Sequence, residues 1–91
     1  MNRKQVEAEL RKARAALRKC VEEKDRSRER AEFLEVKVEE GAYPAFQTWA
    51  FRDDDLKERA AHRRREEELE ARERELENDV RAWENTLKDL P

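Results

Sequence analysis

The sequence has few of the residues that interrupt helices or build reactive sites. Its 91 residues include one glycine, two prolines, one cysteine and one histidine. Cys20 therefore has no partner for a disulfide within the chain, and with His62, far away in the sequence, it makes neither a metal cluster nor a catalytic triad. Because Gly41 is the only glycine, the chain has no glycine-rich phosphate loop. These absences predict a non-enzymatic protein with no metal and no other cofactor.

Long apolar runs are also missing, whereas charge is abundant. Charged residues make up 51% of the chain and apolar residues 36%, and 22 Lys and Arg against 24 Asp and Glu give a net charge of −2. This composition excludes a sizeable globular core and is typical of solvated helices that share a narrow apolar seam. The balance of charge argues against a dedicated nucleic-acid binder. We expect no secretory leader and no membrane span, and a cytoplasmic location.

Residues 3–40 are predicted to form the first helix, because they contain neither glycine nor proline and are rich in strong helix formers. Their apolar residues recur at alternating steps of three and four, which is a heptad pattern with seam positions a and d. The a positions are Leu10, Leu17, Lys24, Ala31 and Val38, and the d positions are Val6, Ala13, Cys20, Ser27 and Leu34. Gly41 follows, at the point where a helix C-terminus favours a residue that tolerates positive φ.

Residues 53–90 are predicted to form the second helix. Its d positions are Leu69, Leu76, Trp83 and Leu90, and its a positions include Val80 and Leu87. The three aspartates at 53–55 are expected to cap its N-terminus rather than to bind a metal ion. Between residues 57 and 68 only Ala60 and Ala61 are apolar, and Leu56 is out of phase with the later seam. That shift predicts a stutter or a change of partner in this stretch.

The two seams predict an all-α fold, an elongated antiparallel helical hairpin of the coiled-coil type. Residues 1–19 carry seven basic and two acidic side chains, whereas residues 70–91 carry four basic and seven acidic ones, which favours antiparallel pairing. Two registers satisfy the seam: the paired residue numbers sum either to 93, with Leu17 opposite Leu76, or to 86, with Leu17 opposite Leu69. We favour 93, because it makes four apolar pairs against three.

Eight residues are predicted to form the seam of the hairpin or of a dimer. They are Val6, Leu10, Leu17, Leu69, Leu76, Val80, Trp83 and Leu87. A lone two-helix hairpin buries little apolar surface compared with the entropy lost on ordering its backbone. We therefore expect a homodimer, in a four-helix arrangement, or docking on another protein. A monomeric hairpin and a domain-swapped dimer would make the same seam pairs.

The connector at residues 41–52 differs in composition from both flanks, because it holds four of the six aromatic residues and a single charge. We predict that these aromatics bind a partner protein, since exposed aromatic side chains anchor interfaces. The alternative is that they fold over the end of the hairpin and cap its seam. The four residues are Tyr43, Phe46, Trp49 and Phe51.

The sequence predicts a small protein-binding module that acts as an adaptor, an assembly factor or an inhibitor. It would dock on a larger protein through the aromatic tip and its charged helix faces. One alternative is a nucleic-acid-binding protein that uses the basic segment 57–65 or the basic N-terminal helix. That segment superficially resembles a basic-region leucine zipper, but Lys57 stands where that family has its base-reading asparagine. Another alternative is a purely structural coiled-coil spacer.

Overall fold

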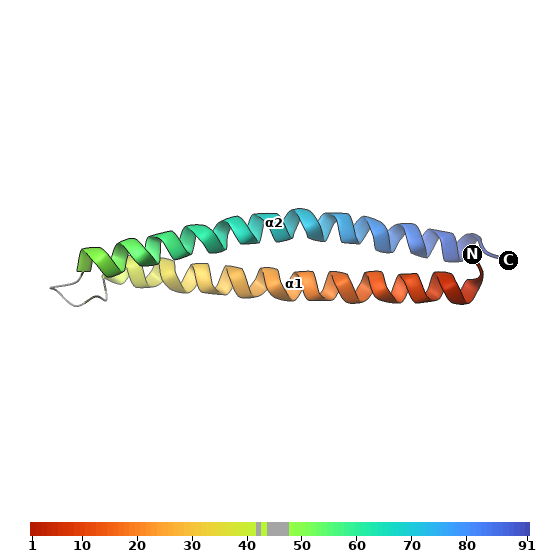
Figure 1. The fold of residues 1–91 in the computed structure, drawn as a ribbon, viewed down its shortest axis with the longest axis horizontal. Helices are drawn as coiled ribbons and strands as arrows, with labels where there is room; N and C mark the ends of the chain where they lie inside the picture. The colour runs from red at the N-terminus through yellow and green to blue at the C-terminus, as the bar shows by residue number, and fades with distance from the viewer. Residues whose placement is uncertain (42, 44–47) are drawn as a thin grey trace. The chain divides into compact units, whose positions relative to one another are not determined.

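Two long helices make up most of the computed structural model, which describes residues 1–41, 43 and 48–91. Helix α1 spans Arg3–Glu40 and helix α2 spans Thr48–Asp89 (Figure 1). The described residues contain no strand. The predicted all-α fold is therefore confirmed, and the bounds of α1 agree with the prediction of a helix over 3–40.

Both ends of α1 are closed by local hydrogen bonds. At the N-terminus, the Gln5 amide donates to Asn2 Oδ1 and the Asn2 amide donates to Gln5 Oε1, each over 2.9 Å. This reciprocal pair is a capping box, which satisfies two amides that have no partner within the helix. At the C-terminus, Gly41 has a φ of 65° and its amide donates to the Val38 carbonyl. The predicted glycine C-cap is confirmed, because only glycine adopts this conformation without strain.

Helix α2 begins five residues earlier than the sequence predicted. It includes Thr48 to Arg52, which we had assigned to the connector, and ends at Asp89. The prediction that residues 53–55 cap the helix is wrong, because these aspartates lie inside it. Asp53 instead pairs with Lys57 at 3.0 Å, one turn further on. No glycine or proline lies between Pro44 and Pro91, so the helix can continue upstream of the aspartates.

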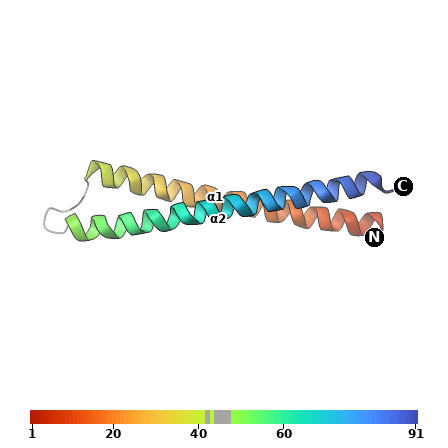
Figure 2. The same cartoon turned by 90° about the horizontal axis from the view of Figure 1, so that it is seen from above.

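The described chain divides into two compact units, each made of one segment from each helix. Unit 1 comprises residues 1–23 and 69–91, and unit 2 comprises residues 24–68. In unit 1, Arg14 pairs with Glu84 while Cys20 contacts Leu69, so residue numbers rise along α2 as they fall along α1. Ion pairs in unit 2 show the same antiparallel order, as the ribbon views illustrate (Figures 1 and 2). The predicted helical hairpin is confirmed.

The core of unit 1 is a small apolar cluster. Cys20, Leu69 and Leu76 are buried in it, and Leu17 packs against them. The Cys20 thiol also donates to the Leu69 carbonyl over 3.3 Å. Because Cys20 contacts both Leu69 and Leu76, it lies opposite residues 72 and 73 of α2. Adding 20 to either number gives about 93, in agreement with the favoured register. The register of 86 would shift Leu76 by seven residues, about 10 Å along the helix axis.

The seam of unit 2 is mostly apolar on α1, with Ser27 as the exception, and mostly polar on α2, although Leu56 is also half-buried there. On α1 the predicted positions Ser27, Ala31, Leu34 and Val38 are all buried. On α2 the corresponding half-buried residues are Arg59, His62 and Glu66, which keep the spacing that Leu69 continues. The expected shift of phase between residues 57 and 68 is therefore not found. Polar side chains simply occupy the seam positions, which hydrophobicity alone could not reveal.

We predict that the unit 1 cluster carries much of the stability. Replacing Leu76 by Ala should lower the free energy of unfolding by about 2–3 kcal/mol, because it removes buried methyl groups that the thin core can only partly refill. The measurement is chemical denaturation followed by circular dichroism.

The control is Asn78→Ala, two residues further along α2 and exposed. Its effect should stay within about 0.5 kcal/mol, as for most surface substitutions. Equal effects of the two variants would contradict the location of the core.

Candidate interaction surfaces

The structure separates the four predicted partner-binding aromatics into different settings. Phe51 lies on α2 and is 45% exposed, which agrees with a role in binding. Tyr43 is half-buried next to the end of α1. Trp49 lies in the first turn of α2, but its side chain is outside the described part of the structure, as is the whole of Phe46. The choice between an interface and a cap can therefore be examined only for Tyr43 and Phe51.

Tyr43 is held against unit 2 by both its ring and its hydroxyl. The hydroxyl donates to Asp55 Oδ2 over 2.6 Å, and Lys37 Nζ lies 3.0 Å from the same oxygen. Lys37 Nζ also lies 5.1 Å from the centroid of the Tyr43 ring, within range of a cation–π contact. Tyr43 thus ties the residues after Gly41 to the first turns of α2, as the capping alternative requires for this residue.

These contacts shift the pKa values of both partners. Burial, followed by the hydrogen bond to Asp55, raises the pKa of Tyr43 to about 12. The hydrogen bonds from Tyr43 and Lys37 lower the pKa of Asp55 below its usual range. Both shifts favour the observed state, in which a neutral hydroxyl donates to a charged carboxylate.

An apolar surface that the sequence analysis did not select lies on the outer face of α1. Phe33 is 56% exposed and Val36 is 51% exposed. Together with Lys37 and Glu40 they line a shallow hollow of about 290 Å³. The Arg30 guanidinium lies 5.2 Å from the centroid of the Phe33 ring. The heptad pattern already indicated that these residues are exposed, because Phe33 and Val36 fall outside positions a and d and therefore face away from the seam.

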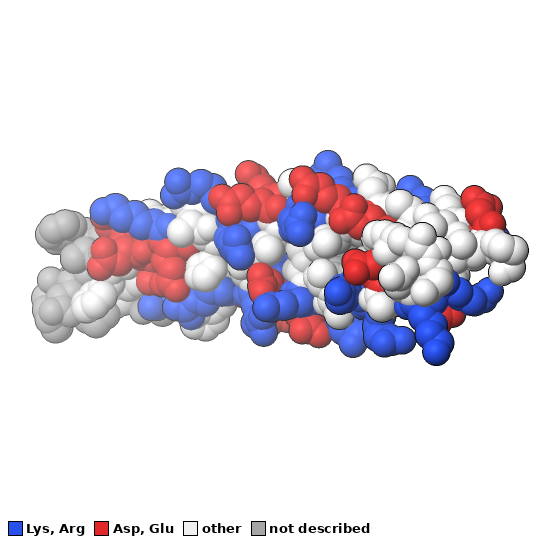
Figure 3. Space-filling model, turned by 45° about the vertical axis from the view of Figure 1, so that its right-hand side comes forward, with Lys and Arg blue, Asp and Glu red and all other residues white. Residues whose placement is uncertain are grey.

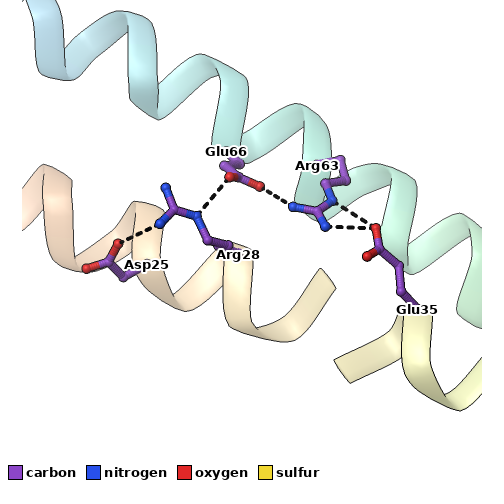
Figure 4. A network of polar contacts seen from close by, with 5 residues as sticks. All are labelled: Asp25, Arg28, Glu35, Arg63 and Glu66. Carbon is purple, nitrogen blue, oxygen red and sulfur yellow. Dashed lines mark hydrogen bonds and ion pairs between the residues drawn. The ribbon is translucent and has the colours of Figure 1, made fainter. Parts of the chain in front are cut away.

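A chain of ion pairs joins the two helices of unit 2 (Figure 4). Glu66 on α2 is its centre: one carboxylate oxygen accepts from Arg28 Nε over 3.1 Å and the other from Arg63 Nη1 over 2.8 Å. Arg63 also donates from Nε and Nη2 to Glu35 Oε1, over 3.1 and 2.8 Å. Arg28 in turn lies 3.8 Å from Asp25. The network thus links α1 to α2 where the seam residues of α2 are polar.

The hydrogen bonds from Arg63 and Arg28 hold the pKa of Glu66 below its ordinary value of 4.5. The carboxylate of Glu66 is the least exposed group in the network, with 17% of its side chain accessible, whereas Arg28 and Arg63 are more open to solvent. Isolated exposed ion pairs add little stability, but a shared acceptor with two donors fixes geometry as well. The network therefore specifies the register of unit 2.

Three of the five Lys and Arg side chains in the basic segment 57–65 pair with neighbouring carboxylates. Lys57 pairs with Asp53 at 3.0 Å, and Arg63 pairs with Glu35 and Glu66 at 2.8 Å. Arg65 lies 3.6 Å from Glu68, and His62 Nε2 lies 3.6 Å from Glu58. The segment therefore presents much less positive charge than its sequence indicates.

The eight predicted seam residues all face inward, but not equally. Four are buried and four are half-buried. The buried ones are Val6, Leu10, Leu69 and Leu76, and the half-buried ones are Leu17, Val80, Trp83 and Leu87. The half-buried ones belong to unit 1. Uncharged surface is visible at the end of the molecule that carries both termini, bordered on one side by Lys and Arg side chains (Figure 3).

The described residues contain no group of three or more His, Cys, Asp or Glu side chains that could hold a metal ion. No described helix is both long enough and apolar enough to cross a bilayer. Cys20 is buried and has the setting of a small core residue.

We predict that Glu66 contributes to acid sensitivity. Its pKa is lower in the folded than in the unfolded chain, so it stabilises the fold at neutral pH and this contribution disappears as the pH falls through and below 4.5. Glu66→Gln should lower the thermal midpoint at pH 7 and flatten its decline between about pH 6 and pH 3. The measurement is a series of thermal melts followed by circular dichroism.

The matched control is Glu67→Gln, at the exposed neighbouring position. This variant should follow the wild-type profile. An unchanged acid profile in Glu66→Gln would show that the network does not couple to folding.

We also predict an unusual titration of Tyr43, which is the only tyrosine and can be followed directly by tyrosinate absorbance. Its midpoint should lie near pH 12 rather than at the ordinary value of 10. Because the folded state favours the neutral hydroxyl, this contribution to stability is present below pH 10 and is lost as the pH rises toward 12. Asp55→Asn should move the midpoint toward 10, whereas Asp54→Asn should not. A wild-type midpoint near 10 would contradict the contact.

Comparisons of this chain with known protein families, with curated proteins and with solved structures give no match. The functional interpretation therefore rests on the geometry and charge of the two units.

Proposed function

We propose that this protein is a non-enzymatic binding module that docks on a larger protein through exposed apolar residues of unit 2. We call Phe33, Val36 and Phe51 the unit 2 patch. Phe46 and Trp49 of the connector are proposed to extend the same contact. The adaptor, assembly-factor and inhibitor roles are all forms of this activity.

The observation that carries the proposal is where the exposed large hydrophobic side chains lie. Of the four in the described residues, three form the unit 2 patch, within residues 33–51, and the fourth is Met1. Unit 2 is also the unit in which α2 offers polar residues to the seam. Two phenylalanines that would strengthen this weak seam thus face solvent instead. Phe33 and Val36 line one hollow on α1 and Phe51 lies on α2, and exposed aromatic residues are enriched in binding surfaces.

The charges next to the patch are suited to orienting a partner rather than to repelling one. Arg30 stacks near Phe33 and pairs with Glu58 at 2.9 Å. Lys37 and Glu40 line the hollow beside Phe33 and Val36, so both signs of charge border the apolar surface. Mixed charges around an apolar centre resemble the polar rim of a protein interface.

Nucleic-acid binding is supported less well, because neighbouring carboxylates already pair with Lys57 and Arg63 of segment 57–65. A purely structural spacer does not account for the exposure of Phe33 and Phe51. Association with a second copy and a cytoplasmic location stay predictions from the sequence.

The test is the double variant Phe33→Ala, Phe51→Ala. Proteins captured from a lysate by the immobilised wild-type chain should be identified, purified and then titrated against both forms. We expect direct binding to weaken by about tenfold or more, as for loss of an aromatic interface anchor, with unchanged helicity by circular dichroism.

The control double variant is Ala71→Ser, Ala82→Ser, at exposed positions of unit 1. It should bind as tightly as wild type. Undiminished binding by the phenylalanine variant would overturn the proposal. If no other protein binds and the phenylalanine variant loses self-association in light scattering, the partner is a second copy. Tight oligonucleotide binding at physiological salt would favour the nucleic-acid alternative.

A further inference from the structure

Unit 1 leaves one side of its seam open. Three hollows, two of about 410 Å³ and one of about 230 Å³, lie along that side and share lining residues with one another. Most of the apolar side chains that line them are only half-buried. The apolar lining consists of Leu10, Leu17, Val80, Leu87 and Leu90. We call this surface the unit 1 groove.

Exposed cations stand at both edges of the unit 1 groove. The α1 edge is mainly basic, whereas the α2 edge also carries Glu77 and Glu84 and has equal numbers of both signs. The apolar lining residues form the floor of the groove. On α1, Arg11 and Arg18 directly follow the floor residues Leu10 and Leu17. On α2, Arg81 and Lys88 directly follow the floor residues Val80 and Leu87. In a helix, the residue after a floor position is rotated by about 100°, so each cation stands at the outer edge. All four cations line the hollows and are exposed.

These four cations make no ion pair within the described residues, unlike Lys57, Arg63 and Arg65 of segment 57–65. Nearer the floor, Arg14 and Glu84 form a pair of 3.4 Å that crosses the groove, and about half of each side chain is exposed. Such a loose surface pair is weak and easily exchanged. The full lining has six basic side chains and three acidic ones, in a chain of net charge −2.

The same sequence positions in unit 2 have the opposite charge. The residues that follow the α1 seam positions 24, 31 and 38 are Asp25, Glu32 and Glu39. Among the a positions of α1, the alternation of an apolar residue with a following cation is therefore confined to unit 1. It is a local feature and not a consequence of overall composition.

The net positive charge of the lining restricts what can occupy the groove. A second copy that presented the same groove would bring together two linings that each have six basic and three acidic side chains, because an isologous contact uses the same surface twice. A nucleic-acid strand would leave the leucine floor without an apolar partner. An α-helix with apolar residues toward the floor and carboxylates along both flanks satisfies the floor and the edges together.

The spacing of the floor also fits a helix. Leu10 and Leu17 are seven residues apart, as are Val80 and Leu87, which places each pair about 10 Å apart along its axis. A partner helix with a heptad pattern repeats its apolar residues over the same distance.

We propose that the unit 1 groove binds an acidic amphipathic α-helix of another protein. This site is separate from the unit 2 patch and does not depend on it. The partner helix would complete a three-helix packing around Leu10, Leu17, Val80 and Leu87, and its carboxylates would pair with the cations at 11, 18, 81 and 88.

The test uses the full chain and a fluorescein-labelled peptide of three identical heptads, with leucine at a and d and glutamate at the flanking e and g positions. We expect saturable binding by fluorescence polarisation that weakens with rising salt. A peptide with lysine at e and g should bind at least tenfold more weakly. So should a glutamate peptide whose leucines are replaced by serine, because the floor would lose its contacts.

The site is located by charge reversal on exposed side chains, which leaves the core intact. Arg11→Glu, Arg81→Glu should weaken binding of the acidic peptide by at least tenfold and improve binding of the lysine peptide. The control Lys19→Glu, Arg64→Glu changes the net charge equally at exposed positions that do not line the groove. It should have a much smaller effect.

Three results would overturn the proposal. They are absence of binding by the acidic peptide, equal weakening by the groove and control variants, and binding that persists when the leucines are replaced. A concentration-dependent dimer in analytical ultracentrifugation, strengthened by Arg11→Glu, Arg81→Glu, would instead assign the groove to a second copy.

Discussion

The alternation of three and four residues between seam positions is the constraint on which the structure depends. A chain with about half its residues charged can bury only a narrow stripe on each helix. On α1 every predicted a and d position, from Val6 to Val38, is buried or half-buried. Once that stripe faces α2, the position of every other side chain follows from its rotation about the helix axis. The seam therefore sets the surfaces as well as the core.

The two units use this stripe in different ways. In unit 1, Leu69 and Leu76 close on Cys20, and packing supplies both stability and register. In unit 2, α2 contributes Arg59, His62 and Glu66 to the seam, and the hydrogen bonds around Glu66 fix the register instead. Directional ion pairs specify a register well but stabilise it less than apolar burial does. Unit 2 thus combines directional ion pairs with an apolar stripe supplied mainly by α1, and Phe33 and Phe51 are exposed to solvent.

The sequence predicted the features that depend on periodicity and on local backbone chemistry. The seam of α1, the glycine C-cap and the antiparallel pairing all follow from the spacing of apolar residues and from the conformational freedom of Gly41. The predictions from sequence were wrong where hydrophobicity does not indicate the structure. The start of α2 at Thr48 was missed because three aspartates resemble a helix cap even when they lie inside a helix. The polar seam was misinterpreted as a stutter because a half-buried glutamate with two arginine donors has no hydrophobic signal.

The candidate surfaces were harder to predict than the fold, for a related reason. Aromatic residues in the connector were conspicuous by composition, yet Tyr43 is tied to Asp55 and Lys37, while Phe33 and Val36 are exposed in the middle of a helical sequence. What separates a structural from a binding residue here is its angular position relative to the seam, and not its type. Cations also differ in their surroundings: Arg63 pairs with Glu35 and Glu66, whereas Arg11 makes no ion pair in the described part of the chain. Both directly follow a seam position, His62 and Leu10, so their different pairing depends on which carboxylates lie within reach and not on rotation about the helix axis alone.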